Sequence, residues 1–156
     1  MTNLLENLPQ LSLPPLPPSR IRLESGAPRI FDPLRGRWVA LTPEEWVRQH
    51  FASWLTGELG YPASHTANEV ALTQIKRQRR ADTIIYDDHA RPYIVVEYKR
   101  PTVKITPAVF DQIARYNSVL HAPVLVVSNG LTHYCCRYNA DGSYTFLKSV
   151  PPYSTK

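Results

Sequence analysis

One predicted β-strand constrains this chain more than any other feature. Residues 93–96 (YIVV) form an apolar run typical of a buried strand, and Glu97 and Lys99 continue its alternation. Side chains alternate across a strand with a period of two, so Val95, Glu97 and Lys99 share one face. Charged groups are almost never buried unless they are paired. The end of this strand is therefore a candidate functional site.

The preceding strand places a second carboxylate beside Glu97. Asp82 begins a predicted strand at residues 81–86, and the polar stretch at 87–91 forms a turn between the two strands. Two adjacent carboxylates repel each other, and Mg²⁺, which accepts hard oxygen ligands and retains several waters, can hold them together. Lys99 would orient or deprotonate an attacking water and stabilise charge that develops on a phosphate.

The remaining patterns predict one α/β domain around this hairpin, because 156 residues suffice for a single core. Two short strands surround a turn at residues 32–36. A helix, three strands, a second helix at 107–120, a buried strand at 123–130 and a C-terminal β-hairpin around residues 141–142 follow. We therefore expect a central mixed β-sheet flanked by helices.

The first helix has the clearest boundaries. Thr42 is a favourable N-cap, Pro43 suits the first helical position, and Glu45 completes a capping box. Gly60 and Pro62 are expected to stop the helix. Its buried face carries four apolar residues at helical spacing: Val47, Phe51, Trp54 and Leu55.

The N-terminal 28 residues differ from the rest of the chain. Four prolines between residues 14 and 18 favour an extended polyproline II arm rather than a core element. Such an arm could bind the aromatic groove of a partner, although we favour a stiff segment that lies across its own domain or a neighbouring subunit. The predicted division is an arm at residues 1–28 and a single domain at 29–156.

The formal net charge of +5 is concentrated near the candidate site. Such clusters attract polyanions by neutralising phosphates, although a solvated surface is the alternative for any one of them. The candidate nucleic-acid-binding residues are Lys76, Arg77, Arg79, Arg80, Arg100 and Lys104. Adjacent Cys135 and Cys136 alternate across a strand and do not favour a disulfide, and no apolar run is long enough to cross a bilayer. We expect a cytoplasmic protein with no membrane association.

These motifs resemble those of a known superfamily. Asp82 with the sequence EYK at residues 97–99 resembles the D…ExK signature of PD-(D/E)XK nucleases, and Gln112 and Tyr116 match its Q-xxx-Y extension. Over about residues 30–150, the chain resembles the N-terminal nuclease domain of type I restriction enzyme R subunits, including the stretches TPEEWVRQHF and VLVVSNGLTHYCC. The resemblance implies a restriction-endonuclease-like core and Mg²⁺-dependent (or Mn²⁺-dependent) cleavage of DNA.

The resemblance also implies a role for each matching residue. Asp82 and Glu97 would bind the metal with the backbone carbonyl of Tyr98, and Lys99 would act on the water and the scissile phosphate. Gln112 and Tyr116 would position the nucleic-acid backbone or Lys99 from one helix face. The further candidate acids are Glu45, for which we favour the capping role, and Glu69.

Two other functions remain open at this stage. A non-cleaving DNA-binding module would have the same fold and basic surface, and an assembly module would use its proline-rich arm to join a restriction or repair complex. The expected partners are DNA, restriction-modification subunits and a second copy of the chain as a homodimer. The sequence has no G-xxxx-GK-[ST] phosphate loop, so this chain is not expected to be an ATP-driven translocase.

Overall fold

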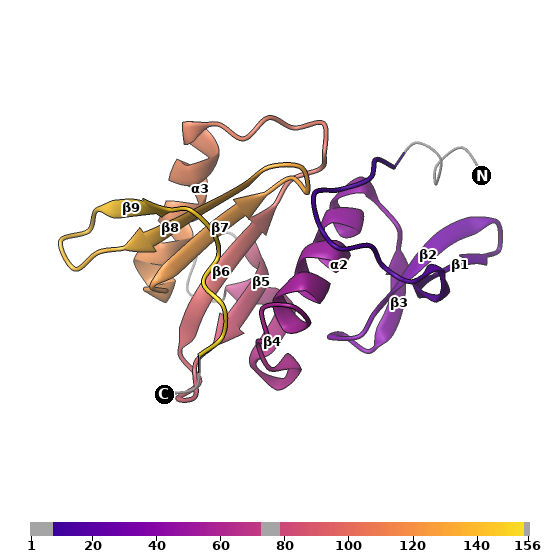
Figure 1. Cartoon of the computed structure of the whole chain (residues 1–156), viewed down its shortest axis with the longest axis horizontal. Coiled ribbons are helices and arrows are strands. Elements are labelled where there is room, and N and C mark those ends of the chain that lie inside the picture. The colour runs from indigo at the N-terminus through magenta and orange to yellow at the C-terminus, as the bar shows by residue number, and fades with distance from the viewer. Residues whose placement is uncertain (1–7, 73–78, 155–156) are drawn as a thin grey trace.

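The structure is a computed structural model that describes residues 8–72 and 79–154. Within them, a three-stranded antiparallel sheet and a six-stranded mixed sheet lie on either side of one helix, α2 (Figure 1). The predicted mixed sheet flanked by helices is confirmed, and the three-stranded sheet is an addition. None of the described helices is long and apolar enough to span a membrane.

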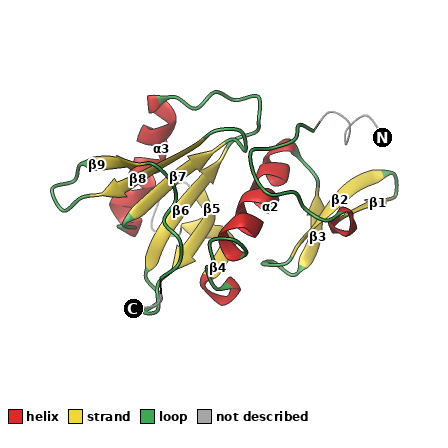
Figure 2. Ribbon diagram, in the orientation of Figure 1, coloured by secondary structure: helices red, strands yellow, loops and turns green. Residues whose placement is uncertain are grey.

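The six-stranded sheet has the order β4-β5-β6-β7-β8-β9. Its strands are β4 (Thr66–Leu72), β5 (Arg79–Tyr86), β6 (Pro92–Tyr98), β7 (Val124–Ser128), β8 (His133–Tyr138) and β9 (Tyr144–Leu147). Only the β6–β7 pair is parallel among the described pairs, and α3 (Pro107–Leu120) makes the crossover between these two strands (Figure 2). The predicted C-terminal hairpin is β8 with β9.

Two apolar cores lie on opposite faces of this sheet. On one face, Val47, Phe51 and Leu55 of α2 (Pro43–Thr56) pack against β6 residues that include Val96 and Tyr98. On the other face, Ile113 of α3 packs against residues from β5, β6 and β7, namely Ile84, Val95, Leu125 and Val127. Because β6 and β7 are covered on both sides, their sequences are almost continuously apolar.

Helix α2 begins at the predicted N-cap but ends earlier than predicted. The Thr42 hydroxyl accepts a hydrogen bond from the Glu45 backbone N–H at 3.1 Å. Regular helix ends at Thr56, before the predicted stop. Gly60 then adopts a φ of 78° and turns the chain so that the Tyr61 N–H donates to the Leu55 carbonyl.

The expectation of an arm outside the core is wrong for parts of residues 1–28. A short 3₁₀ turn, η1 (Pro18–Arg20), leads into β1 (Ile21–Glu24), which pairs with β2 (Ala27–Asp32), and β2 pairs with β3 (Arg37–Ala40). Leu11 is buried in the α2-side core, and the Ser12 N–H donates to the Gly130 carbonyl. The segment from residue 8 thus lies across its own domain, as we favoured.

Candidate functional site

The candidate site lies where β5 and β6 stop pairing. The last pair of their antiparallel register at this end is Thr83 with Val96, and the next position sets Asp82 opposite Glu97. Beyond this pair, the Tyr98 N–H donates to the Asp82 Oδ2 at 2.8 Å, so a carboxylate replaces the missing backbone partner. The hairpin therefore places the two predicted carboxylates side by side.

The proton affinities of these two acids reflect their proximity. Burial first, and then the charge of Asp82 and a hydrogen bond with it, raise the pKa of Glu97 to about 8, although Lys99 opposes the rise. Burial also raises the pKa of Asp82, which the Tyr98 N–H and Arg48 only partly offset. Near neutral pH the pair therefore retains a proton on Glu97.

Lys99 completes the acid–acid–lysine group that the sequence predicts. Its backbone N–H donates to the Ser128 carbonyl at 2.8 Å, which extends the β6–β7 ladder beyond Tyr98. Its Nζ lies 3.8 Å from the Glu97 Oε1, and its side chain is 23% exposed. The ammonium group is thus held beside the carboxylates with access to solvent.

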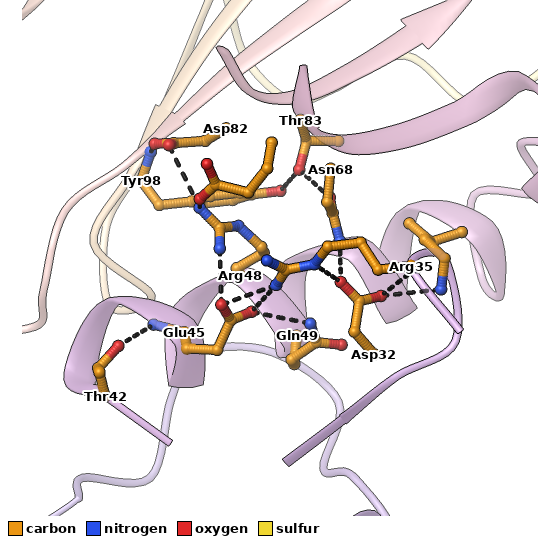
Figure 3. A network of polar contacts seen from close by, with 12 residues as sticks. Asp32, Arg35, Thr42, Glu45, Arg48, Gln49, Asn68, Asp82, Thr83 and Tyr98 are labelled. Carbon is orange, nitrogen blue, oxygen red and sulfur yellow. Dashed lines mark hydrogen bonds and ion pairs between the residues drawn. The ribbon is translucent and has the colours of Figure 1, made fainter. Parts of the chain in front are cut away.

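A buried arginine from α2 also joins the site (Figure 3). The Arg48 Nη1 lies 2.7 Å from Glu45, and its Nη2 lies 2.6 Å from Glu69 and 3.3 Å from Asp82. Burial lowers the pKa of Arg48, but the attraction of the three carboxylates, Glu45 first, outweighs it and leaves the pKa raised. Arg48 is therefore the main counterion of the acids in this state.

The two further candidate acids both bind this arginine. Glu69 lies between the Asn68–Thr83 and Val70–Ala81 pairs of the β4–β5 register and has a left-handed φ of 58°, which is strained for a residue with a side chain. The Glu45 carboxylate accepts from Arg35, Arg48 and Gln49. The reciprocal bond of a capping box, in which the Thr42 N–H donates to the Glu45 carboxylate, is absent from the described residues, so that half of the prediction is wrong.

A series of side-chain hydrogen bonds links the site to Asp32. The Tyr98 hydroxyl donates to Thr83, the Thr83 hydroxyl donates to Asn68, and the Asn68 amide donates to Asp32, over distances of 2.8, 2.6 and 3.0 Å (Figure 3). Asp32 is fully buried and also pairs with Arg35. Each of these four side chains therefore has a hydrogen-bond partner, and the bonds fix the strands that carry Asp82 and Glu97.

Once Glu97 loses its proton, the charge balance of the cluster fits a divalent cation. Asp32, Glu45, Glu69, Asp82 and Glu97 supply five carboxyl groups, and Arg35, Arg48 and Lys99 supply three cations. No group of three or more His, Cys, Asp or Glu side chains within residues 8–72 and 79–154 is arranged to hold a metal ion. Mg²⁺ can bind through one or two carboxylates and complete its shell with waters and phosphate, so the pair Asp82 and Glu97 fits it.

Comparison with known proteins identifies the family. Residues 43–151 match the family described as type I restriction enzyme R protein N terminus (HSDR_N). The chain belongs to this family. Three solved chains also match. One is a fragment assigned as an HsdR subunit of a type I restriction enzyme from Vibrio vulnificus YJ016, with a TM-score of 0.54 and 20% identity, and the match covers 72% of this chain and 24% of that one. No curated protein matches the chain.

Gln112 lies apart from the hydrogen bonds that join the carboxylates. Gln112 is half-buried on α3, and within the described part of the chain no hydrogen bond links it to Lys99, Asp82 or Glu97. The helix preserves the four-residue spacing between Gln112 and Tyr116, whose side chain is outside the described structure.

Part of the predicted basic surface also lies outside the described structure. Lys76 and Arg77 fall within residues 73–78, and β5 begins at Arg79, whose side chain is likewise not described. Three other basic residues of the prediction are exposed: Arg80, Arg100 and Lys104. Arg80 and Arg100 lie within three residues of Asp82 and Glu97 along their strands.

Sequence reasoning missed Arg48, although the sequence contained a signal. Arg48 lies three residues before Phe51 and seven before Leu55, so a helical wheel places its cation on the buried face of α2. A buried arginine needs carboxylate partners. The roles of Asp32, Arg35, Asn68 and Thr83 had no comparable signal, because their partners come from distant segments.

Proposed function

We propose that this HSDR_N domain has a restriction-endonuclease-like (PD-(D/E)XK) core and cleaves DNA phosphodiester bonds with Mg²⁺ or Mn²⁺ as cofactor. The observation that carries the proposal is the carboxyl pair Asp82 and Glu97, with Lys99 3.8 Å from Glu97, at the point where two strands diverge. Raised carboxyl pKa values beside a lysine are typical of catalytic sites.

Different residues would bind the metal, activate the water and position the DNA. Asp82 and Glu97 would hold the metal with the Tyr98 carbonyl, and the ion, when bound, would neutralise charge on the phosphate. The Lys99 ammonium would orient the attacking water and stabilise negative charge that develops on the phosphate oxygens. Gln112 and Tyr116 would position the DNA backbone from α3, and the basic residues near β5 and β6 would contact phosphates.

Arg48 would have a supporting role in this scheme. Without metal it neutralises Asp82 through a 3.3 Å contact, longer than its contacts with Glu45 and Glu69. Metal binding would replace this weaker contact and leave the two shorter ones intact. Arg48 would then keep Glu69 and Glu45 neutralised, so that only Asp82 and Glu97 remain to bind the ion.

The pairing between Arg48 and Asp82 also supports a second candidate function. If the arginine is not displaced, the domain would bind DNA or a restriction-modification subunit without cleavage. The chain spans about a quarter of the length of the HsdR fragment that it matches, so the activities and partners of a whole R subunit remain proposals for this chain.

Cleavage assays separate these two functions. Purified protein would be incubated with plasmid, single-stranded and branched DNA in Mg²⁺, Mn²⁺ or EDTA. We expect metal-dependent cleavage that falls by roughly 10²- to 10³-fold in Lys99→Ala, the loss typical of one preorganised electrostatic group, with DNA binding almost unchanged. Lys148→Ala, an exposed lysine that belongs neither to the site nor to the predicted basic surface, is the matched control.

Metal binding provides a readout that does not need cleavage. Ligands bind a metal in deprotonated form, so Mg²⁺ should release a proton from Glu97 at pH 7. Titration calorimetry in buffers of different ionisation enthalpy measures this release, which Glu97→Gln should abolish. Cleavage by Lys99→Ala at the parental rate would refute the assigned site, and a parent that cuts none of the substrates with either metal would favour the non-cleaving module.

A further inference from the structure

The three-stranded sheet presents a basic and aromatic face to solvent. In β2, Ile30 and Asp32 point inward and are fully buried, so Arg29 and Phe31 point outward by alternation. The strand register sets Arg22 of β1 opposite Arg29, and Trp38 of β3 opposite Phe31. We refer to Arg22, Arg29, Phe31 and Trp38 as the basic face, and Glu24 of β1 lies on the same side.

The two arginines of the basic face lack strong internal partners. Arg22 pairs with Glu24 at 3.1 Å, but both side chains are about half exposed (49% and 50%), so the pair contributes little. Within residues 8–72 and 79–154, no carboxylate forms an ion pair with Arg29. Like charges directly opposite each other on a sheet are destabilising. The face therefore carries positive charge that an anionic ligand would neutralise.

The two aromatic side chains make this face suitable for a base as well as for phosphate. The Arg22 guanidinium lies 4.1 Å from the centre of the Trp38 ring, and the Phe31 and Trp38 rings meet edge to face with centroids 5.4 Å apart. Both aromatic side chains are partly exposed. Arginines beside aromatic rings on a sheet are the elements that bind single-stranded nucleic acid, because phosphates pair with the cations and bases stack on the rings.

The surrounding charge supports a polyanionic ligand. Residues 20–40 contain five arginines and only two acids, Glu24 and Asp32. Asp32 and Arg35 pair with each other away from the surface, so neither contributes to this balance. On the basic face Arg22 and Arg29 outnumber the single acid Glu24, whereas exposed Arg37 lies opposite inward-facing Asp32 and therefore on the other side of the sheet. This excess complements a nucleic-acid backbone.

We propose that the basic face binds single-stranded DNA. Arg29 would contact one phosphate, and Arg22 would leave the Trp38 ring for a second phosphate, so that a base takes its place on the ring. The sheet precedes the residues 43–151 that match the family, and it is separate from the basic residues flanking β5 and β6. It is joined to α2 by the Arg20–Gln49 and Arg35–Glu45 contacts. Binding of single-stranded DNA to the basic face does not require cleavage, so this proposal can be tested separately from the proposed nuclease function.

Fluorescence anisotropy with a labelled single-stranded oligonucleotide in EDTA tests this proposal. The double variant Arg22→Ala/Arg29→Ala should bind more weakly and show a salt slope shallower by about 1.4, from about 0.7 for each lost phosphate contact on a single strand. Arg91→Ala/Arg137→Ala is the control, because it removes two exposed arginines from other strands and turns. Its affinity should fall much less.

Stacking is tested at Trp38. Trp38→Leu keeps an apolar side chain and removes the ring, and it should weaken binding roughly 5- to 100-fold, because stacking of one base is worth about 1–3 kcal/mol. Trp38→Phe should restore most of the loss, and thermal melts confirm that each variant is folded. Unchanged affinity and slope in the arginine double variant would overturn the proposal. An equal loss on duplex DNA with no effect of Trp38→Leu would overturn the single-strand assignment.

Discussion

The raised pKa of Glu97 predicts that removing its charge stabilises the metal-free protein. The unfolded chain ionises Glu97 near 4.5, whereas in the folded chain burial and Asp82 raise the pKa to about 8. Between these values the folded state binds more protons, so the stabilisation is present below about pH 4.5 and is lost as the pH rises towards 8. Glu97→Gln removes this titration and should therefore be more stable than the parent at neutral pH.

The size of the effect follows from the two pKa values. One pH unit is worth about 1.4 kcal/mol, and at pH 7 the pH has risen about 2.5 units above the unfolded pKa of Glu97 while the folded carboxyl group is still mostly protonated. This corresponds to about 3 kcal/mol of unfolding free energy, which is an upper limit because Asp82 shares the titration. We expect Glu97→Gln to exceed the parent by about 1–3 kcal/mol at pH 7, with a smaller difference near pH 5.

Urea unfolding in EDTA between about pH 5 and pH 8.5 measures this difference. Burial lowers the pKa of His50 and of His133, so their contribution to stability rises with pH through about 6.5, opposite in sign to Glu97. Both histidines remain in the variant, and their contributions cancel in the comparison. Glu58→Gln, an exposed change beyond the other end of α2, controls for net charge. A stability difference that stays constant across this pH range would refute the reasoning.

Three further predictions concern the support of the site. Arg48→Met leaves three carboxylates, including Asp82, without their buried partner. It should reduce the unfolding free energy by about 3–5 kcal/mol in urea titrations, and Mg²⁺ should restore part of that loss. A loss below about 1 kcal/mol would contradict the counterion role. Thr42→Ala removes the α2 N-cap and should cost about 1 kcal/mol, whereas Thr42→Ser should cost almost nothing. Tyr98→Phe deletes the hydroxyl that donates to Thr83 and should cost about 1–2 kcal/mol by thermal melting, with Tyr134→Phe, an exposed tyrosine, as the control.

The sequence alone determined the elements whose signals are local. The apolar runs of β6 and β7, the cap of α2 at Thr42 and the C-terminal hairpin depend on side-chain alternation, capping and turn residues, all of which act within a few positions. The closeness of Asp82 and Glu97 was also predictable, because a hairpin brings its two strands together. Their position opposite each other was not, because it depends on a register shift between Ile85 and Tyr86.

The three-stranded sheet and the burial of Leu11 were not predictable from these patterns. β1 is short and mostly exposed, so it has no apolar alternation that distinguishes it from an extended arm. Its strand character comes from backbone bonds to β2. Leu11 is buried only because β7 and α2 bring Gly130 and Val47 to the same place, where the Gly130 position leaves room for its side chain.

Only the tertiary structure decided how the acids are neutralised. Arg48, Glu69 and Asp82 come from α2, β4 and β5, and the ion pairs between them form when the helix packs on the sheet. A sequence shows which residues carry charge, but it does not show which of them lie close together in the interior. There the dielectric constant is low, and a charge is stable only beside an opposite charge. The sequence predicted a carboxyl pair that needs a cation, and the folded chain already places a protein cation, the Arg48 guanidinium, against one member of that pair.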